Sequence, residues 1–192
     1  LGVFKKHSSR LIQNISLLVL LITAVITFNE TLGIDEVRLF NGSVIVDYLS
    51  SFMKIATLIT AFLVLVISSN YLRSLNIFKI EYPILILSSV LGMMIMISSN
   101  DLIVFYMGLE LQSLALYVLA TFNRDQIKSS EAGLKYFVLS ALSSGLLLYG
   151  CSLIYGFTGS TNFNVIANQL NSNEYALTFG IVFILVGLAF KI

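Results

Sequence analysis

A single carboxylate, Glu110, stands in the apolar stretch from Leu102 to Thr121. A charge near the centre of a bilayer costs at least about 2.5–3.5 kcal/mol, so an acidic residue at that depth usually has a partner or a task. Two lysines, Lys135 and Lys191, occur in later apolar stretches and are candidate partners. An acid and two bases inside a membrane protein indicate proton handling.

The depth of Glu110 predicts where its partner lies. At 1.5 Å per residue, about 13 Å of helix separates it from Asp101, which is further than a short side chain reaches. We therefore expect a partner on another helix. Without one, Glu110 would be protonated and would act as a hydrogen-bond donor.

The lysines allow more than one interpretation. Lys135 follows Glu131 by four residues, so the two can form a local pair at the helix start. Alternatively, small residues further along this helix would let it pack closely on the helix of Glu110, which would suit a pair between Lys135 and Glu110. Lys191 would lie about 22 Å into its segment, too deep for easy contact with water, and is predicted to be functional. Lys54 is close enough to a helix end for its ammonium to reach the headgroups.

A buried acid and base can work as a proton switch. Burial disfavours an ammonium ion, while a nearby carboxylate stabilises it. At about 7 Å and an effective dielectric of 20, the attraction amounts to about 2.4 kcal/mol. Moving or neutralising the carboxylate therefore favours release of the lysine's proton.

The composition indicates the fold class that positions these residues. The chain of 192 residues is 57% hydrophobic and only 11% charged, with a mean hydropathy of +0.93, whereas soluble domains contain about 25% charged residues. The apolar runs are continuous and lack the alternation of a membrane β-barrel. We predict an all-α polytopic membrane helix bundle, one transmembrane domain over 1–192, with five complete transmembrane helices and a truncated sixth. The predicted spans are 11–28, 48–68, 82–99, 102–121, 132–156 and 176–192.

Basic residues in the connections predict the orientation, because they accumulate on the cytoplasmic side. Only Arg38 lies in the connections on the opposite side. We therefore expect residue 1 on the cytoplasmic side of a bacterial inner membrane, or on the matrix side in a mitochondrial inner membrane. The basic residues assigned to that side are Lys5, Lys6, Arg10, Arg73, Lys79, Arg124 and Lys128.

Several function classes are excluded as roles of this chain. With Cys151 as the only cysteine, the chain cannot hold an iron–sulfur cluster by itself. It has no Gly-rich phosphate loop and no metal-ligand spacing. No basic run is long enough to follow a nucleic-acid backbone, so we expect no nucleic-acid partner.

Four runs of residues are similar to a known family. As a set they resemble the antiporter-like subunit N of the proton-pumping NADH:quinone oxidoreductase, respiratory complex I, whose mitochondrial counterpart is NADH dehydrogenase subunit 2. The runs are Asn100-Asp101-Leu102-Ile103, Gly108-Leu109-Glu110-Leu111-Gln112-Ser113-Leu114, Ser130-Glu131-Ala132-Gly133-Leu134-Lys135-Tyr136-Phe137 and Val186-Gly187-Leu188-Ala189-Phe190-Lys191.

The resemblance implies roles for three residues. Glu110 matches the family's essential glutamate in its fifth transmembrane helix, Lys135 the lysine early in the sixth, and Lys191 the lysine before the break in the seventh. The chain starts at Leu1 and ends in an apolar run, so we expect a piece of a longer chain. The resemblance implies that it lacks the family's first helix and everything after the middle of the seventh. The resemblance also implies other membrane subunits of complex I as partners, the lipid bilayer as surroundings and protons as the transported species. Flavin, iron–sulfur clusters and quinone are expected in partner subunits, with no cofactor in this chain.

Two other functions stay open. Subunits of multisubunit cation/proton antiporters share the glutamate and the final lysine, although the Gly-Leu-Glu-Leu context favours subunit N. A structural membrane subunit, in which buried charges only hold helices together, is the third possibility.

Overall fold

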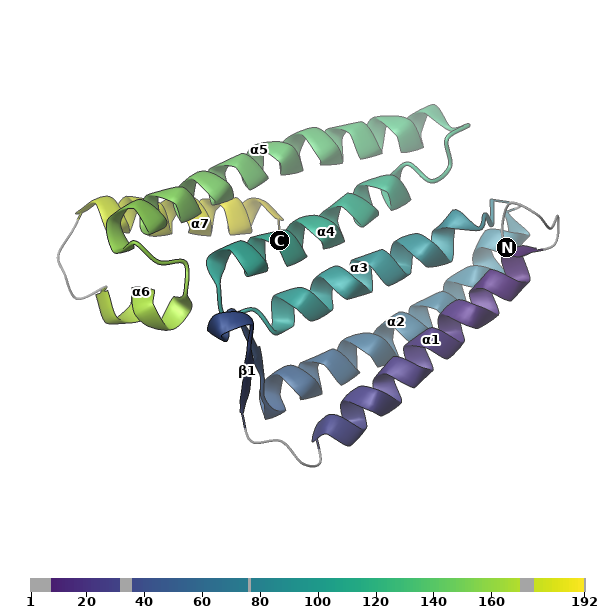
Figure 1. Ribbon diagram of the computed structural model, residues 1–192. Helices are drawn as coiled ribbons and strands as arrows, with labels where there is room; N and C mark the ends of the chain where they lie inside the picture. Colours follow the sequence, from purple (N-terminus) through teal and green to yellow (C-terminus); the bar gives the residue numbers. More distant parts are fainter. Residues whose placement is uncertain (1–7, 32–35, 76, 170–174, 192) are drawn as a thin grey trace.

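The computed structural model describes residues 8–31, 36–75, 77–169 and 175–191 of the chain. These residues form helices and one small hairpin (Figure 1). The elements are α1 (Ser8–Thr31), β1 (Val37–Leu39), the short 3-10 turn η1 (Phe40–Gly42), β2 (Val44–Val46), α2 (Tyr48–Ser74), α3 (Glu81–Ile97), α4 (Leu102–Ala120), α5 (Ile127–Thr158), α6 (Phe163–Gln169) and α7 (Tyr175–Lys191).

The long helices pack mainly on their neighbours in the sequence. α1 contacts α2, α2 contacts α3, α3 contacts α4 and α4 contacts α5, while α7 returns along α5 (Figure 1). Two apolar clusters hold this row together. One lies among α1, α2 and α3 around Leu58 and Leu65, and the other joins α4, α5 and α7 around Leu109 and Leu147. The second cluster positions the helices that carry Glu110 and Lys191.

The predicted all-α membrane helix bundle is confirmed, with a different helix count. All six apolar spans are helices, but α3 and α7 have 17 residues each and are shorter than the rest. In the described part of the chain, four helices are long and apolar enough to cross a membrane. They are Arg10–Asn29, Tyr48–Ser74, Leu102–Ala120 and Ile127–Thr158. The short α6 and the hairpin β1–β2 come in addition to the prediction.

Three helices extend well beyond their predicted spans, including α1, which runs from Ser8 to Thr31 where 11–28 was predicted. α5 begins at Ile127, before the predicted start at 132, and α2 continues to Ser74, so Arg73 belongs to its last turn and not to a loop. The Arg73 guanidinium donates a hydrogen bond to Gln13 on α1 and lies 5.0 Å from the centre of the Phe78 ring. These partners satisfy the charge at the end of α2. Of the other basic residues used for the orientation, Lys5 and Lys6 lie outside the described residues.

A buried polar junction ties three connections together at the start of α4. The Asp101 carboxylate caps α4 by accepting from the backbone N–H of Ile103 at 2.8 Å, and it accepts from the Thr161 hydroxyl at 2.5 Å. The Asn100 side chain donates to the Gly42 carbonyl at 2.8 Å. Thus the hairpin, the start of α4 and the segment after α5 are fixed to one another, and this sets the height of Glu110 in the bundle.

The start of α2 provides a pH-dependent contribution to stability. The Ser50 backbone N–H donates to the Asp47 carboxylate at 2.7 Å, and the Ser50 hydroxyl accepts from the Asp47 N–H at 2.9 Å. The hydrogen bond from the Ser50 backbone N–H holds the pKa of Asp47 below the ordinary value of 3.8, and the bond with the Ser50 hydroxyl contributes a smaller effect in the same direction. A lowered pKa in the folded state means stability that is present above the unfolded value and lost as pH falls through the folded value.

We expect Asp47→Ala to lower the free energy of unfolding of the full-length protein by about 0.5–2 kcal/mol at neutral pH, the usual effect of losing an N-cap. The difference from the wild type should shrink as the pH falls below about 4. Denaturant unfolding in detergent at a series of pH values measures this. Asp47→Asn is the control, because asparagine also caps a helix but does not titrate. A difference that stays constant down to pH 2 would contradict the assigned role of the ionised carboxylate.

Candidate functional site

Glu110 lies near the middle of α4 and faces two other helices. Its carboxylate forms an ion pair with the Lys191 ammonium in the last turn of α7. The Lys191 side chain is 7% exposed and the Glu110 side chain 21% exposed. The two residues are far apart in the sequence, and they meet because α4 and α7 both pack on α5.

A serine on α5 completes the surroundings of the carboxylate. The Ser144 hydroxyl donates to Glu110 Oε1 at 2.5 Å, the same oxygen that Lys191 contacts. Ser144 is buried on α5, the helix that packs on both α4 and α7. Both partners of Glu110 are therefore on other helices, as its depth in the sequence predicts.

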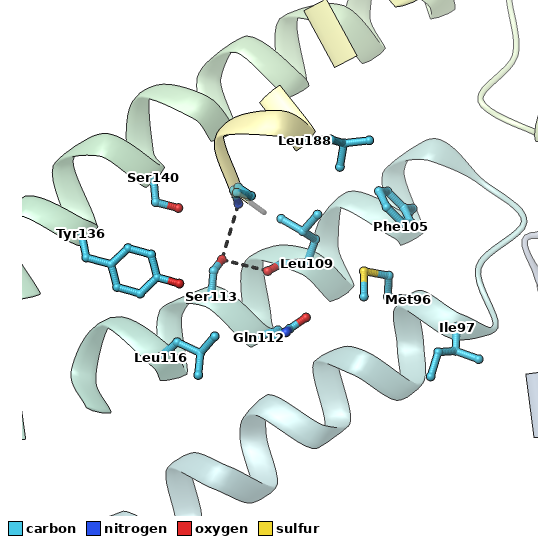
Figure 2. A pocket seen from close by; sticks show the side chains of 11 residues that line it. Met96, Ile97, Phe105, Leu109, Gln112, Ser113, Leu116, Tyr136, Ser140 and Leu188 are labelled. Atoms are coloured by element: carbon cyan, nitrogen blue, oxygen red, sulfur yellow. Dashed lines mark hydrogen bonds between the residues drawn. The ribbon is translucent and has the colours of Figure 1, made fainter. Parts of the chain in front are cut away.

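A second hydroxyl lies near the ammonium. Ser113 Oγ is 3.5 Å from Lys191 Nζ, and its hydroxyl donates to the Leu109 carbonyl at 2.8 Å (Figure 2). From the sequence we placed Ser113 off the helical face of Glu110, which is wrong, and we did not assign Ser144 to the site. The signal for Ser113 was its spacing of three residues from Glu110, which places both on one face of α4. For Ser144, the sequence indicated only a small residue suited to helix packing.

A cavity of about 390 Å³ adjoins Lys191 and is large enough for several water molecules. It lies among α3, α4, α5 and α7 (Figure 2). Most of its wall is apolar, and its polar side chains are those of Gln112, Ser113, Tyr136, Ser140 and Lys191. The ammonium therefore borders a space in which water can form hydrogen bonds.

Of the two candidate lysine partners, Lys191 pairs with Glu110, whereas Lys135 lies elsewhere in this structure. Its ammonium contacts Glu131 at 2.6 Å, and its side chain is 68% exposed. Lys135 lies about 13 Å along α5 from Ser144 and about 180° around the helix. It therefore faces away from Glu110, and the local pair with Glu131 is the arrangement found. The involvement of Lys135 in proton transfer stays a prediction.

The pair has the chemistry of a proton-binding site. Lys191 and Glu110 stabilise each other's charged forms, because each supplies the counter-charge that the surroundings lack. Protonation of Glu110 would leave Lys191 as a buried, uncompensated cation. The site thus brings an acid and a base into contact beside a cavity that water can enter.

Comparisons with known proteins indicate the family of the chain. The family described as "NADH:quinone oxidoreductase/Mrp antiporter, TM" matches residues 99–192. The chain is 69% identical over its whole length to NADH-quinone oxidoreductase subunit N of Pelagibacter ubique (strain HTCC1062) and 50% identical to the subunit N of Maricaulis maris (strain MCS10). The chain belongs to the family of NADH-quinone oxidoreductase subunit N. The resemblance drawn from the sequence is confirmed.

A solved structure agrees with the membership of this family. A chain in the structure of respiratory complex I from Thermus thermophilus with bound aureothin superimposes with a TM-score of 0.78 at 28% identity. The match covers 95% of the present chain and 39% of that chain. Likewise, the chain spans 41% and 40% of the two bacterial relatives.

Proposed function

We propose that this chain is part of a proton-translocating membrane subunit of NADH:quinone oxidoreductase, in which buried Glu and Lys residues couple quinone reduction to proton transfer. The observation that carries the proposal is the part-buried ion pair between Glu110 on α4 and Lys191 on α7. A buried pair of this kind binds or releases a proton when its electrostatic surroundings change. The membership of the subunit N family supports the assignment to this complex.

In this mechanism, Glu110 controls the proton on Lys191. While Glu110 is ionised and close, the ammonium is stable. When the carboxylate is neutralised or displaced, the ammonium is left without its counter-charge, and Lys191 gives its proton to water in the adjoining cavity. Lys135 would complete the relay after a rearrangement that brings it a partner other than Glu131, a role that rests on the resemblance of its helix start to the family.

We assign no redox step to this chain. The only cysteine, Cys151, is buried among apolar residues, and an iron–sulfur cluster needs several thiolates. Flavin, iron–sulfur clusters and quinone would belong to partner subunits. Other membrane subunits of complex I are the proposed partners, with protons as the transported species.

The proposed location is a bacterial inner membrane, with residue 1 on the cytoplasmic side. The bond between Arg73 and Gln13 supports this orientation, because it brings the end of α2 beside the first turns of α1, where Arg10 lies. Basic residues at the ends of two helices thus gather at one end of the bundle. Arg38 is on β1, beyond the opposite end of α2.

The test is Glu110→Gln in the full-length subunit, because glutamine keeps the size and hydrogen bonding but cannot ionise. We expect proton pumping in membrane vesicles and coupled quinone reduction to fall at least about tenfold, in line with the loss of a proton-transfer group. Assembly of the complex should stay intact. Glu81→Gln in the exposed first turn of α3 is the matched control and should pump normally.

Two outcomes favour the alternatives. Normal pumping by Glu110→Gln in an assembled complex contradicts a proton-transfer role, and loss of assembly indicates a structural subunit. A multisubunit cation/proton antiporter is the second candidate, because the matching family's description includes antiporters. Co-purification of the full-length protein with NADH-oxidising subunits would indicate complex I, whereas co-purification with small antiporter chains would indicate the antiporter.

A further inference from the structure

The Ser144 hydroxyl has one proton and two acceptors within reach. Its oxygen lies 2.5 Å from Glu110 Oε1 and 2.9 Å from the Ser140 carbonyl oxygen in the preceding turn of α5. One O–H cannot donate fully to both. The hydroxyl therefore donates mainly to the stronger acceptor, and the charge on Glu110 determines which of the two acceptors is stronger.

We propose that Ser144 is a positioning residue whose hydroxyl switches between Glu110 and the Ser140 carbonyl according to the protonation of Glu110. The inference rests on the proposed proton-transfer function and names a residue that regulates the same site. It requires no change in the backbone, because rotation about one side-chain torsion moves the proton from one acceptor to the other.

The two states of the switch follow from the donors and acceptors present. When Glu110 is ionised, Ser144 donates to Oε1 and holds that oxygen against Lys191. When Glu110 takes up a proton, its new O–H donates to Ser144 Oγ, and the serine proton turns to the Ser140 carbonyl. In both states Glu110 and Ser144 remain hydrogen-bonded to each other, but the bond to the charged carboxylate is the stronger one, so Ser144 favours ionised Glu110.

Few other titratable groups act on Glu110 in the described part of the chain. α7 contributes Lys191, and on α4 the Tyr106 phenol lies one turn before Glu110. α5 faces Glu110 with the Ser144 hydroxyl. α3 carries its ionisable side chains, Glu81 and Tyr82, in its first turn, more than about 10 Å along that helix from Gly92, where it contacts α4.

The test compares Ser144→Ala with Ser143→Ala in the full-length subunit within the assembled complex. Ser143 is the matched control, because it is also buried on α5 and its hydroxyl also donates to the Ser140 carbonyl, at 2.8 Å. Its hydroxyl is not bonded to Glu110. Alanine favours a helix, so both variants should fold. Ser144→Thr retains the hydroxyl and serves as the rescue variant.

Two measurements are made on each variant. The first is the pH profile of proton pumping. Ser144→Ala removes a hydrogen bond to the charged carboxylate, which then takes up a proton more readily. The loss of pumping on the acid side should therefore occur at a pH about one to two units higher than in the wild type. Ser143→Ala and Ser144→Thr should keep the wild-type profile.

The second measurement is the infrared band of the protonated Glu110 carboxyl group, seen as the acid-induced band that Glu110→Gln lacks. In Ser144→Ala this band should move to higher wavenumber, because the acid loses a hydrogen-bond partner. An unchanged band and profile in Ser144→Ala, or an equal change in Ser143→Ala, would overturn the inference. The infrared result does not depend on pumping, so failure of the proposed function in Glu110→Gln is distinguishable from failure of the switch.

Discussion

Replacing Lys191 by methionine is expected to abolish proton pumping and to destabilise the subunit. The variant leaves the Glu110 carboxylate between α4 and α5 without its cation. Breaking a buried ion pair by removing one partner costs about 3–5 kcal/mol. We expect the lower end of that range, because Glu110 is partly exposed and can take up a proton. Unfolding in detergent measures the stability, and proton uptake by vesicles measures the pumping.

The double variant Glu110→Gln/Lys191→Met separates stability from proton transfer. Without charges on either side, most of the lost stability should return, since neutral replacements of a buried pair are often neutral in energy. Pumping should stay at background. Lys128→Met, on the exposed start of α5, is the control and should change neither property. Recovery of pumping in the double variant would contradict a proton-carrying role for the pair.

The helices and the pairing of Glu110 with Lys191 could be predicted from the sequence, whereas the hydroxyl groups around this pair could not. The cost of burying a charge is so large that the depth of Glu110 alone required a partner from another helix, and the structure has Lys191 there. Hydroxyl groups carry no such cost when they bond to the carbonyl of the preceding turn, as Ser144 also does. The sequence therefore could not distinguish a serine that contacts Glu110 from one that only allows close packing.

Helix periodicity explains why Lys135 does not contact Glu110. Its position early in a membrane helix made it a candidate partner for Glu110, but the angle between Lys135 and Ser144 on α5 places them on opposite faces. The sequence alone did not show which face of α5 contacts α4. The observed pair with Glu131 has the spacing of four residues that stabilises exposed helices by a few tenths of a kcal/mol.

The hairpin and α6 were not predicted because their sequence signals are weak. Each strand has only three residues, so the Asn41-Gly42 pair, which adopts positive φ in the turn and is typical of hairpins, is not flanked by a strand pattern long enough to recognise. The strands are stabilised by the junction at Asn100 and not by a periodic pattern of their own: the Asn100 N–H donates to the Ser43 carbonyl at 2.8 Å. Tertiary contacts of this kind are not visible in local sequence.

Gly92→Ala is expected to disrupt the packing of α3 on α4. A Cβ atom at Gly92 would lie 2.6 Å from the Gln112 backbone nitrogen and 2.7 Å from the Gly108 carbonyl oxygen. Both atoms belong to the backbone of α4 on either side of Glu110, so neither can move without moving the helix. We expect a loss of about 1–3 kcal/mol in the free energy of unfolding, the usual cost of overpacking. Pumping should fall as well, since small displacements of a reacting group can reduce rates about 100-fold.

Gly145→Ala makes the same chemical change on α5 at a position where a Cβ atom meets nothing within 4 Å. Because alanine is the better helix former, this variant should gain about 0.5–1 kcal/mol or stay neutral, with normal pumping. Denaturant unfolding and vesicle pumping of the two full-length variants measure the contrast. Equal behaviour of Gly92→Ala and Gly145→Ala would mean that α4 tolerates displacement from α3. The close backbone contact would then have no part in holding Glu110 at the height where it meets Lys191.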